Sequence, residues 1–145
     1  MAGKLPAVRH LPVPVLPISL GAGALAVVGF APFDFWPLPM LSLAVLFTLL
    51  ARTASMRAGF IIGLTWGLGF FIAGVSWIFV SLSVHGGMAA WLAALATFLF
   101  CAVLALFPAA VGALQARWPC APALRLLLLM PLAWGVTEWV RGWLF

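Results

Sequence analysis

The placement of a few charged residues constrains this 145-residue chain more than any other feature of its sequence. Basic residues stand before the first long apolar block and in alternate gaps after it, whereas the two acids lie near the opposite ends of those blocks. Charges sorted in this way are typical of a membrane protein that crosses the bilayer several times in one fixed orientation. The basic residues concerned are Lys4, Arg9, Arg52, Arg57, Arg117 and Arg125, and the acids are Asp34 and Glu138.

The overall composition supports a membrane environment. Hydrophobic residues make up 67% of the chain and charged residues 6%, whereas soluble domains have roughly 45–50% and about 25%. The net charge of +5 does not indicate a nucleic-acid partner, because the basic residues form no cluster or face. Neither Cys101 nor Cys120 has a CxxC spacing or a nearby histidine, so the sequence predicts no disulfide framework, no metal site and no cofactor.

The apolar blocks predict an all-α fold, namely a transmembrane helix bundle of about five spans. Crossing the hydrocarbon core takes about 20 apolar residues, and the second block is short for that length. Pro108 inside the fourth block predicts a kink, because proline removes a backbone donor. We expect residues 1–11 to form an N-terminal segment and residues 12–145 to form the membrane region, with spans at about 12–31, 38–51, 58–82, 88–116 and 123–145.

The basic residues also orient the predicted bundle. Cytoplasmic loops of membrane proteins carry an excess of Lys and Arg, and six of the seven basic residues share the side of the N-terminus. We therefore expect the N-terminus in the cytoplasm, and the odd-numbered loops and the C-terminal end on the external side. Arg141 is the exception, and it lies three residues after Glu138, so the two can pair on one helix face.

A glycine repeat marks the third predicted span. Gly59, Gly63 and Gly67 recur every four residues, and Gly74 follows. Small residues at this spacing allow a second helix to approach closely where van der Waals contact drives association. The sequence therefore predicts a helix-packing face, and a groove for a lipid tail is the alternative.

Glu138 is the only acid inside an apolar block, and ionisable residues in membrane spans are candidates for function. One interpretation is an ion pair with Arg141 that sets helix depth. The other is contact with a lipid headgroup or a neighbouring domain, with Arg141 meeting phosphate. Trp77 and His85 are further candidates for such a contact. No catalytic residue is predicted, because Ser81 and His85 lack the third partner of a nucleophilic triad.

Several motifs, in order, resemble those of bacterial apolipoprotein N-acyltransferases. Residues 29–37 (GFAPFDFWP) are similar to the first external loop of that family. Residues 74–81 (GVSWIFVS), followed by GGM at 86–88, resemble its third span and next loop. Residues 137–143 (TEWVRGW) resemble the end of its fifth span. The resemblance extends over residues 21–145.

This resemblance implies a multi-pass protein of the bacterial inner membrane, with eight spans and a nitrilase-like domain on the periplasmic side. Such enzymes transfer an acyl chain from a membrane phospholipid to the N-terminal cysteine amine of a diacylated apolipoprotein. A cysteine thiolate takes the acyl group as a thioester, and a glutamate and a lysine assist. These reacting residues belong to the nitrilase-like domain, so Cys101, Cys120 and Glu138 are not expected to react.

Two hypotheses about function follow. In the first, the chain is the N-terminal membrane module of an apolipoprotein N-acyltransferase, lacks the catalytic residues and is inactive alone. In the second, it is a small polytopic membrane protein that binds lipid or a partner without catalysis. The coding DNA beyond codon 145 distinguishes them, because only the first expects three further spans and a soluble domain with Glu, Lys and Cys.

Overall fold

A computed structural model describes residues 14–118 and 121–144. The predicted segment 1–11, with Lys4 and Arg9, lies outside the described residues, and so does Cys120. Within the described part every regular element is a helix, so the predicted all-α class is confirmed. The elements are α1 (Val15–Ala26), η1 (Val27–Gly29), α2 (Pro37–Ala51), α3 (Met56–Val75), α4 (Trp77–Val80), η2 (Ser81–His85), α5 (Ala90–Gln115), α6 (Pro122–Leu124), η3 (Arg125–Leu129) and α7 (Met130–Leu144).

Local sequence explains where several of these helices begin. Pro37 opens α2, and proline suits the first helical turn because no intrahelical donor is needed there. Ser55 caps α3, since its hydroxyl accepts a hydrogen bond from the Ala58 amide. Pro108 lies inside α5, which continues as one helix from Ala90 to Gln115.

The predicted third and fifth spans are each divided in the structure. The segment from Met56 to His85 consists of α3, the single-turn α4 and the π-helix η2. The segment from Pro122 to Leu144 consists of α6, the π-helix η3 and α7. Two of the described helices, α3 and α5, are long and apolar enough to cross a membrane, and the segments Val15–Gly29 and Pro37–Ala51 are shorter apolar helices.

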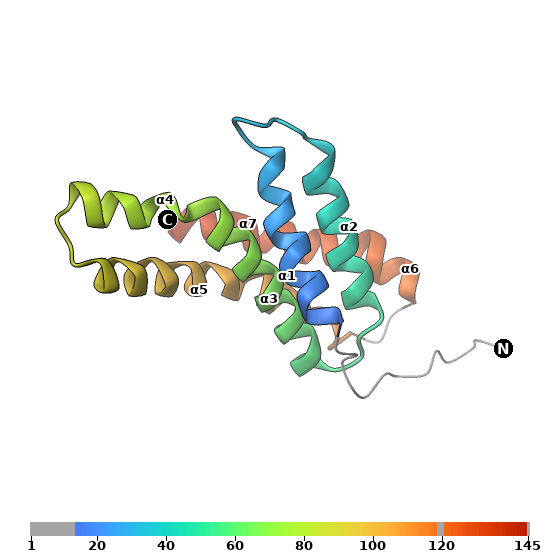
Figure 1. The fold of residues 1–145 in the computed structure, drawn as a ribbon. Helices are drawn as coiled ribbons and strands as arrows, with labels where there is room; N and C mark the ends of the chain where they lie inside the picture. The colour runs from blue at the N-terminus through green and yellow to red at the C-terminus, as the bar shows by residue number, and fades with distance from the viewer. Residues whose placement is uncertain (1–13, 119–120, 145) are drawn as a thin grey trace.

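Helix α3 lies at the centre of the arrangement. It packs along α5 on one side and against α1 on the other, and α7 packs against α5. The α3–α5 pair is antiparallel and joined at its far end through α4 and η2 (Figure 1). Helix α1 runs along the other side of α3, with close contacts from Ser19 at Ile62 to Gly23 at Trp66.

Glycines bring α3 directly against the backbone of α5. A Cβ atom added at Gly59 would overlap the Gly112 carbonyl oxygen, and one at Gly63 would overlap the Pro108 carbonyl oxygen. A Cβ at Gly67 would lie 2.9 Å from the Ala105 Cα. No larger residue fits these positions without moving the backbone. This contact is called the glycine seam below and comprises Gly59, Gly63 and Gly67 of α3 with Ala105, Pro108 and Gly112 of α5.

The opposite side of α3 also makes close contacts through glycine. A Cβ at Gly69 would overlap the Leu20 carbonyl oxygen of α1, and one at Gly23 of α1 would overlap the Trp66 carbonyl oxygen. Gly74 differs from the other predicted packing glycines, because it is exposed and a Cβ there would lie 3.4 Å from the nearest atom, Cγ2 of Val27. It therefore takes no part in the seam.

Candidate functional site

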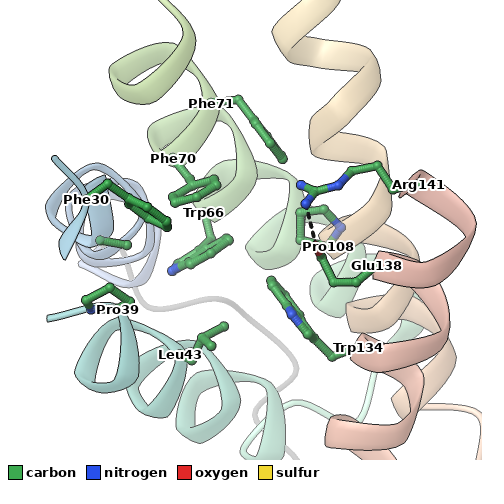
Figure 2. A pocket seen from close by; sticks show the side chains of 11 residues that line it. Phe30, Pro39, Leu43, Trp66, Phe70, Phe71, Pro108, Trp134, Glu138 and Arg141 are labelled. Atoms are coloured by element: carbon green, nitrogen blue, oxygen red, sulfur yellow. Dashed lines mark hydrogen bonds and ion pairs between the residues drawn. The ribbon is translucent and has the colours of Figure 1, made fainter. Parts of the chain in front are cut away.

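A cavity of about 320 Å³ lies where the α1–α2 hairpin, α3 and α7 meet. Large rings from α3 and α7 face one another across it, and a charged pair from α7 lies at its edge (Figure 2). This volume falls in the range of small-molecule sites. The space is called the aromatic cavity, and its lining consists of Ala26, Phe30, Pro39, Leu43, Trp66, Phe70, Phe71, Pro108, Trp134, Glu138 and Arg141.

The charged pair at the edge of the cavity consists of Glu138 and Arg141. The Arg141 Nη2 donates a hydrogen bond to the Glu138 Oε2, as expected for residues three apart on a helix. The guanidinium carbon also lies 5.5 Å from the centroid of the Phe71 ring, within the range of a cation–π contact. The carboxylate and the ring together fix the guanidinium at the cavity. The Arg141 side chain is 28% exposed and the Glu138 side chain 36%.

Arg141 has more donors than this pairing uses. A guanidinium carries five N–H groups in a planar fork that matches carboxylate and phosphate oxygens. The structure gives it a bond to Glu138 through Nη2. An anion that enters the cavity edge therefore has donors to meet, and Glu138 holds them in one orientation. The site is suited to binding an apolar molecule with an anionic group.

Stacked rings form the inner wall of the aromatic cavity. The Trp66 and Phe70 rings are 5.3 Å apart between centroids and nearly parallel, at 12°. Trp134 meets Trp66 edge-on at 5.4 Å, and Phe71 meets Phe70 edge-on at 5.1 Å. These are favourable geometries for aromatic pairs. The rings therefore form one connected wall from Trp134 to Phe71.

A buried hydrogen-bonded chain fixes the Trp66 ring. The indole Nε1 donates to the Ser42 Oγ at 2.9 Å, and the Ser42 hydroxyl donates to the Ala22 carbonyl oxygen at 2.6 Å. Trp66 is 3% exposed and Ser42 is 4% exposed. These two hydrogen bonds link α3, α2 and α1. They also give the indole N–H a partner, and a buried polar group without one is costly.

The structure brings only part of the predicted site together. Glu138 and Arg141 meet at the cavity, whereas Trp77 is an exposed residue of α4 and His85 is exposed at the end of η2. Neither Trp77 nor His85 lines the cavity. Among residues 14–118 and 121–144, no group of three or more His, Cys, Asp or Glu side chains is placed to hold a metal ion.

Sequence reasoning missed the aromatic wall and Ser42. A signal was available for part of it, because Trp134, Glu138 and Arg141 are spaced by four and three residues and so share one face of α7. Trp66 and Phe70 are likewise four apart on α3. Ser42 offered no signal, because its partner Trp66 is 24 residues away in the chain.

The fold and the cavity together define an all-helical, strongly apolar domain with an acid–base pair at the edge of an aromatic site. Residues 22–145 match the family model described as the apolipoprotein N-acyltransferase N-terminal domain. The chain therefore belongs to this family, and the resemblance inferred from the sequence motifs is confirmed.

Individual relatives agree with this family. The chain is 45% identical over 129 residues to the apolipoprotein N-acyltransferase of Methylococcus capsulatus, covering 88% of the chain and 25% of the relative. It is 40% identical over 127 residues to that of Photobacterium profundum, covering 87% and 24%. It is 41% identical over 132 residues to that of Pseudomonas syringae pv. tomato, covering 87% and 25%. The chain thus spans about a quarter of the length of these relatives.

Proposed function

We propose that this chain acts as the membrane-embedded N-terminal module of an apolipoprotein N-acyltransferase. The whole enzyme would transfer an acyl chain from a membrane phospholipid to the N-terminal cysteine amine of a diacylated apolipoprotein. The observation that carries this proposal is the match of residues 22–145 to the N-terminal domain of that family. None of the reacting groups is assigned to this chain, because its described cysteine, Cys101, is fully buried in α5.

Within the enzyme, the module would hold the acyl donor. The aromatic cavity offers apolar surface to part of an acyl chain, and Arg141 at its edge offers N–H donors to the phosphate. Glu138 would keep the guanidinium oriented while the site is empty. Trp77 and His85, which are exposed and away from the cavity, would contact headgroups or the neighbouring catalytic domain.

We further propose that the chain lies in the bacterial inner membrane with its N-terminus in the cytoplasm. The apolar helices α3 and α5 and the sorted basic residues support this orientation. Single cysteines test it in a background that lacks Cys101 and Cys120. A membrane-impermeant maleimide should label His85→Cys in intact spheroplasts, and Ser55→Cys only after permeabilisation. The opposite labelling pattern would reverse the proposed orientation.

The proposed activity is tested in cells depleted of their own N-acyltransferase. A chimera carries this chain in place of the matching N-terminal region of the Methylococcus capsulatus relative. Mass spectrometry of a lipoprotein N-terminus should show that the chimera restores N-acylation and that the 145 residues alone do not.

A matched chimera serves as the control for the junction. It carries the corresponding region of the Photobacterium profundum relative, which matches this chain at 40% identity. If that control is active and the chimera with this chain reaches the membrane but is inactive, the proposed function is wrong. N-acylation by the 145 residues alone would contradict the assignment of the reacting groups to another part of the enzyme.

A further inference from the structure

The Ser42 hydroxyl has only one geometry open to it. A hydroxyl carries a single proton, and Ser42 donates it to the Ala22 carbonyl oxygen at 2.6 Å. Its lone pairs are thus free to accept from the Trp66 Nε1, which lies 2.9 Å away. The direction of the indole N–H is set by this bond, because both residues are almost fully buried. The plane of the Trp66 ring is therefore defined by a contact outside the aromatic cavity.

Contacts between aromatic rings connect Trp66 to Arg141 at the edge of the cavity. Trp66 stacks on Phe70, and Phe70 meets the Phe71 ring edge-on. The face of Phe71 in turn supports the Arg141 guanidinium. Trp66 also meets Trp134, which lies on α7 with the charged pair (Figure 2). A rotation of the Trp66 ring would disturb contacts on both routes to Arg141.

We propose that Ser42 is a positioning residue for the aromatic cavity. Its hydroxyl holds the Trp66 ring in the plane that leaves the cavity open, and through the ring contacts it sets where Arg141 meets an anionic ligand. This inference rests on the proposed function, in which the ligand is the phospholipid acyl donor. Removing the hydroxyl leaves a buried indole N–H without a partner, so the ring turns to find another.

The chain contains a matched control for this role. The Ser19 hydroxyl is also fully buried, and it donates to the Ile62 carbonyl oxygen at 2.9 Å. This bond links α1 to α3, as the hydrogen bonds of Ser42 also do, but neither Ser19 nor Ile62 lines the cavity. The variant Ser19→Ala therefore removes one buried interhelical hydrogen bond and leaves the Trp66 ring in place.

The first test observes the ring itself. The full chain is labelled with 5-fluorotryptophan and placed in phosphatidylglycerol nanodiscs, and Trp66→Phe assigns the Trp66 fluorine resonance. Ser42→Ala should shift or split this resonance, Ser42→Thr should restore it, and Ser19→Ala should leave it unchanged. A phosphatidylglycerol with a nitroxide on its acyl chain should broaden the Trp66 resonance in the parent chain. The broadening should fall roughly fivefold in Ser42→Ala, the population change that one net hydrogen bond supports.

The second test uses the active chimera and separates binding from chemistry. Ser42→Ala and Trp66→Phe should each raise the KM for phospholipid roughly fivefold and leave kcat unchanged, because the reacting groups lie elsewhere. The double variant should match the single variants, because both remove the same bond. Ser19→Ala should leave KM unchanged.

Several outcomes would overturn the inference. It fails if Ser42→Ala and Ser19→Ala behave alike in the resonance and in KM, since Ser42 would then serve stability alone. It also fails if the nitroxide lipid does not broaden Trp66 in the parent chain. The proposed function is judged separately, by complementation with the chimera, so an active chimera with an unresponsive Trp66 rejects only the role of Ser42.

Discussion

Two regions around helix α3, the glycine seam with α5 and the aromatic cavity, are built in opposite ways. In the seam, α3 presents glycines without side chains, and its backbone lies directly against α5. Towards the α1–α2 hairpin and α7, the same helix presents the large rings of Trp66 and Phe70, and a cavity of about 320 Å³ remains. Helix α3 thus takes part both in a tightly packed helix contact and in the wall of a cavity.

The difference shows how side-chain size divides structural and binding roles along one helix. Small residues allow the close packing that holds helices together in lipid. Rigid rings hold helices apart and leave space that they do not fill, and such space can accept a ligand. We therefore expect changes in the seam to alter stability and changes at the cavity to alter activity.

Gly63→Ala should have the largest effect, and on stability. The new Cβ would overlap the Pro108 carbonyl oxygen and lie 2.9 Å from the Ala109 Cα, so backbone rather than a flexible side chain must move. Overpacking costs about 1–3 kcal/mol, and the overlap with backbone atoms places this variant at the upper end of that range. Unfolding of the chain by SDS in mixed micelles, followed by circular dichroism, measures the change.

Gly135→Ala is the matched control on α7. A Cβ there would have no atom within 4 Å, and alanine favours a helix over glycine by up to about 1 kcal/mol. The variant should be as stable as the parent or slightly more stable. Equal destabilisation by Gly63→Ala and Gly135→Ala would show that the seam is not special.

Arg141→Met should lower acyl transfer strongly and change stability little. It removes the donors and the charge at the cavity edge and keeps an apolar side chain over Phe71. Hydrogen bonds to charged groups contribute about 1.5–3 kcal/mol, so acyl transfer by the chimera should fall roughly tenfold or more. Stability should change by less than about 1 kcal/mol, because the pair with Glu138 is partly exposed.

A second arginine provides the comparison for this variant. Arg57 is exposed in the first turn of α3 and lies outside the cavity lining. Arg57→Met removes the same charge and should leave acyl transfer within about twofold of the parent, since surface substitutions usually have small effects. A loss as large as that of Arg141→Met would point to net charge rather than to the cavity.

Gln115→Leu should have the smallest effect. The Gln115 Nε2 donates to the Leu50 carbonyl oxygen at 3.1 Å and, at 3.5 Å, to the Thr53 carbonyl oxygen, but its Oε1 is buried without a hydrogen-bond partner. Leucine loses the bond and also removes the unsatisfied oxygen, so the net cost should be about 1 kcal/mol. SDS unfolding measures this, with acyl transfer unchanged. A cost near that of Gly63→Ala would show that the amide contact between α5 and α2 contributes as much to stability as the glycine seam between α3 and α5.

Parts of the fold and site followed from local patterns. The glycines at 59, 63 and 67 marked a packing face, and the spacing of Glu138 and Arg141 indicated a pair on one helix face. The division of residues 56–85 into α3, α4 and a π-helix was not predicted, because residues 58–82 form one continuous stretch without a charged residue. Trp77 lies in one of the family motifs and His85 directly precedes another, yet neither residue lines the cavity.

The sequence by itself determined the apolar character, the helical class, the packing face of α3 and the family, because each depends on composition or on spacing within a few turns. Only the tertiary structure decided which rings face one another and that Ser42 fixes Trp66. The physical reason is that the cavity is lined by residues of α2, α3 and α7 and of the α1–α2 connection, which only the tertiary structure brings together. Their arrangement is set by contacts between residues far apart in the chain, such as Ser42 with Trp66 and Trp66 with Trp134, and no local period encodes it.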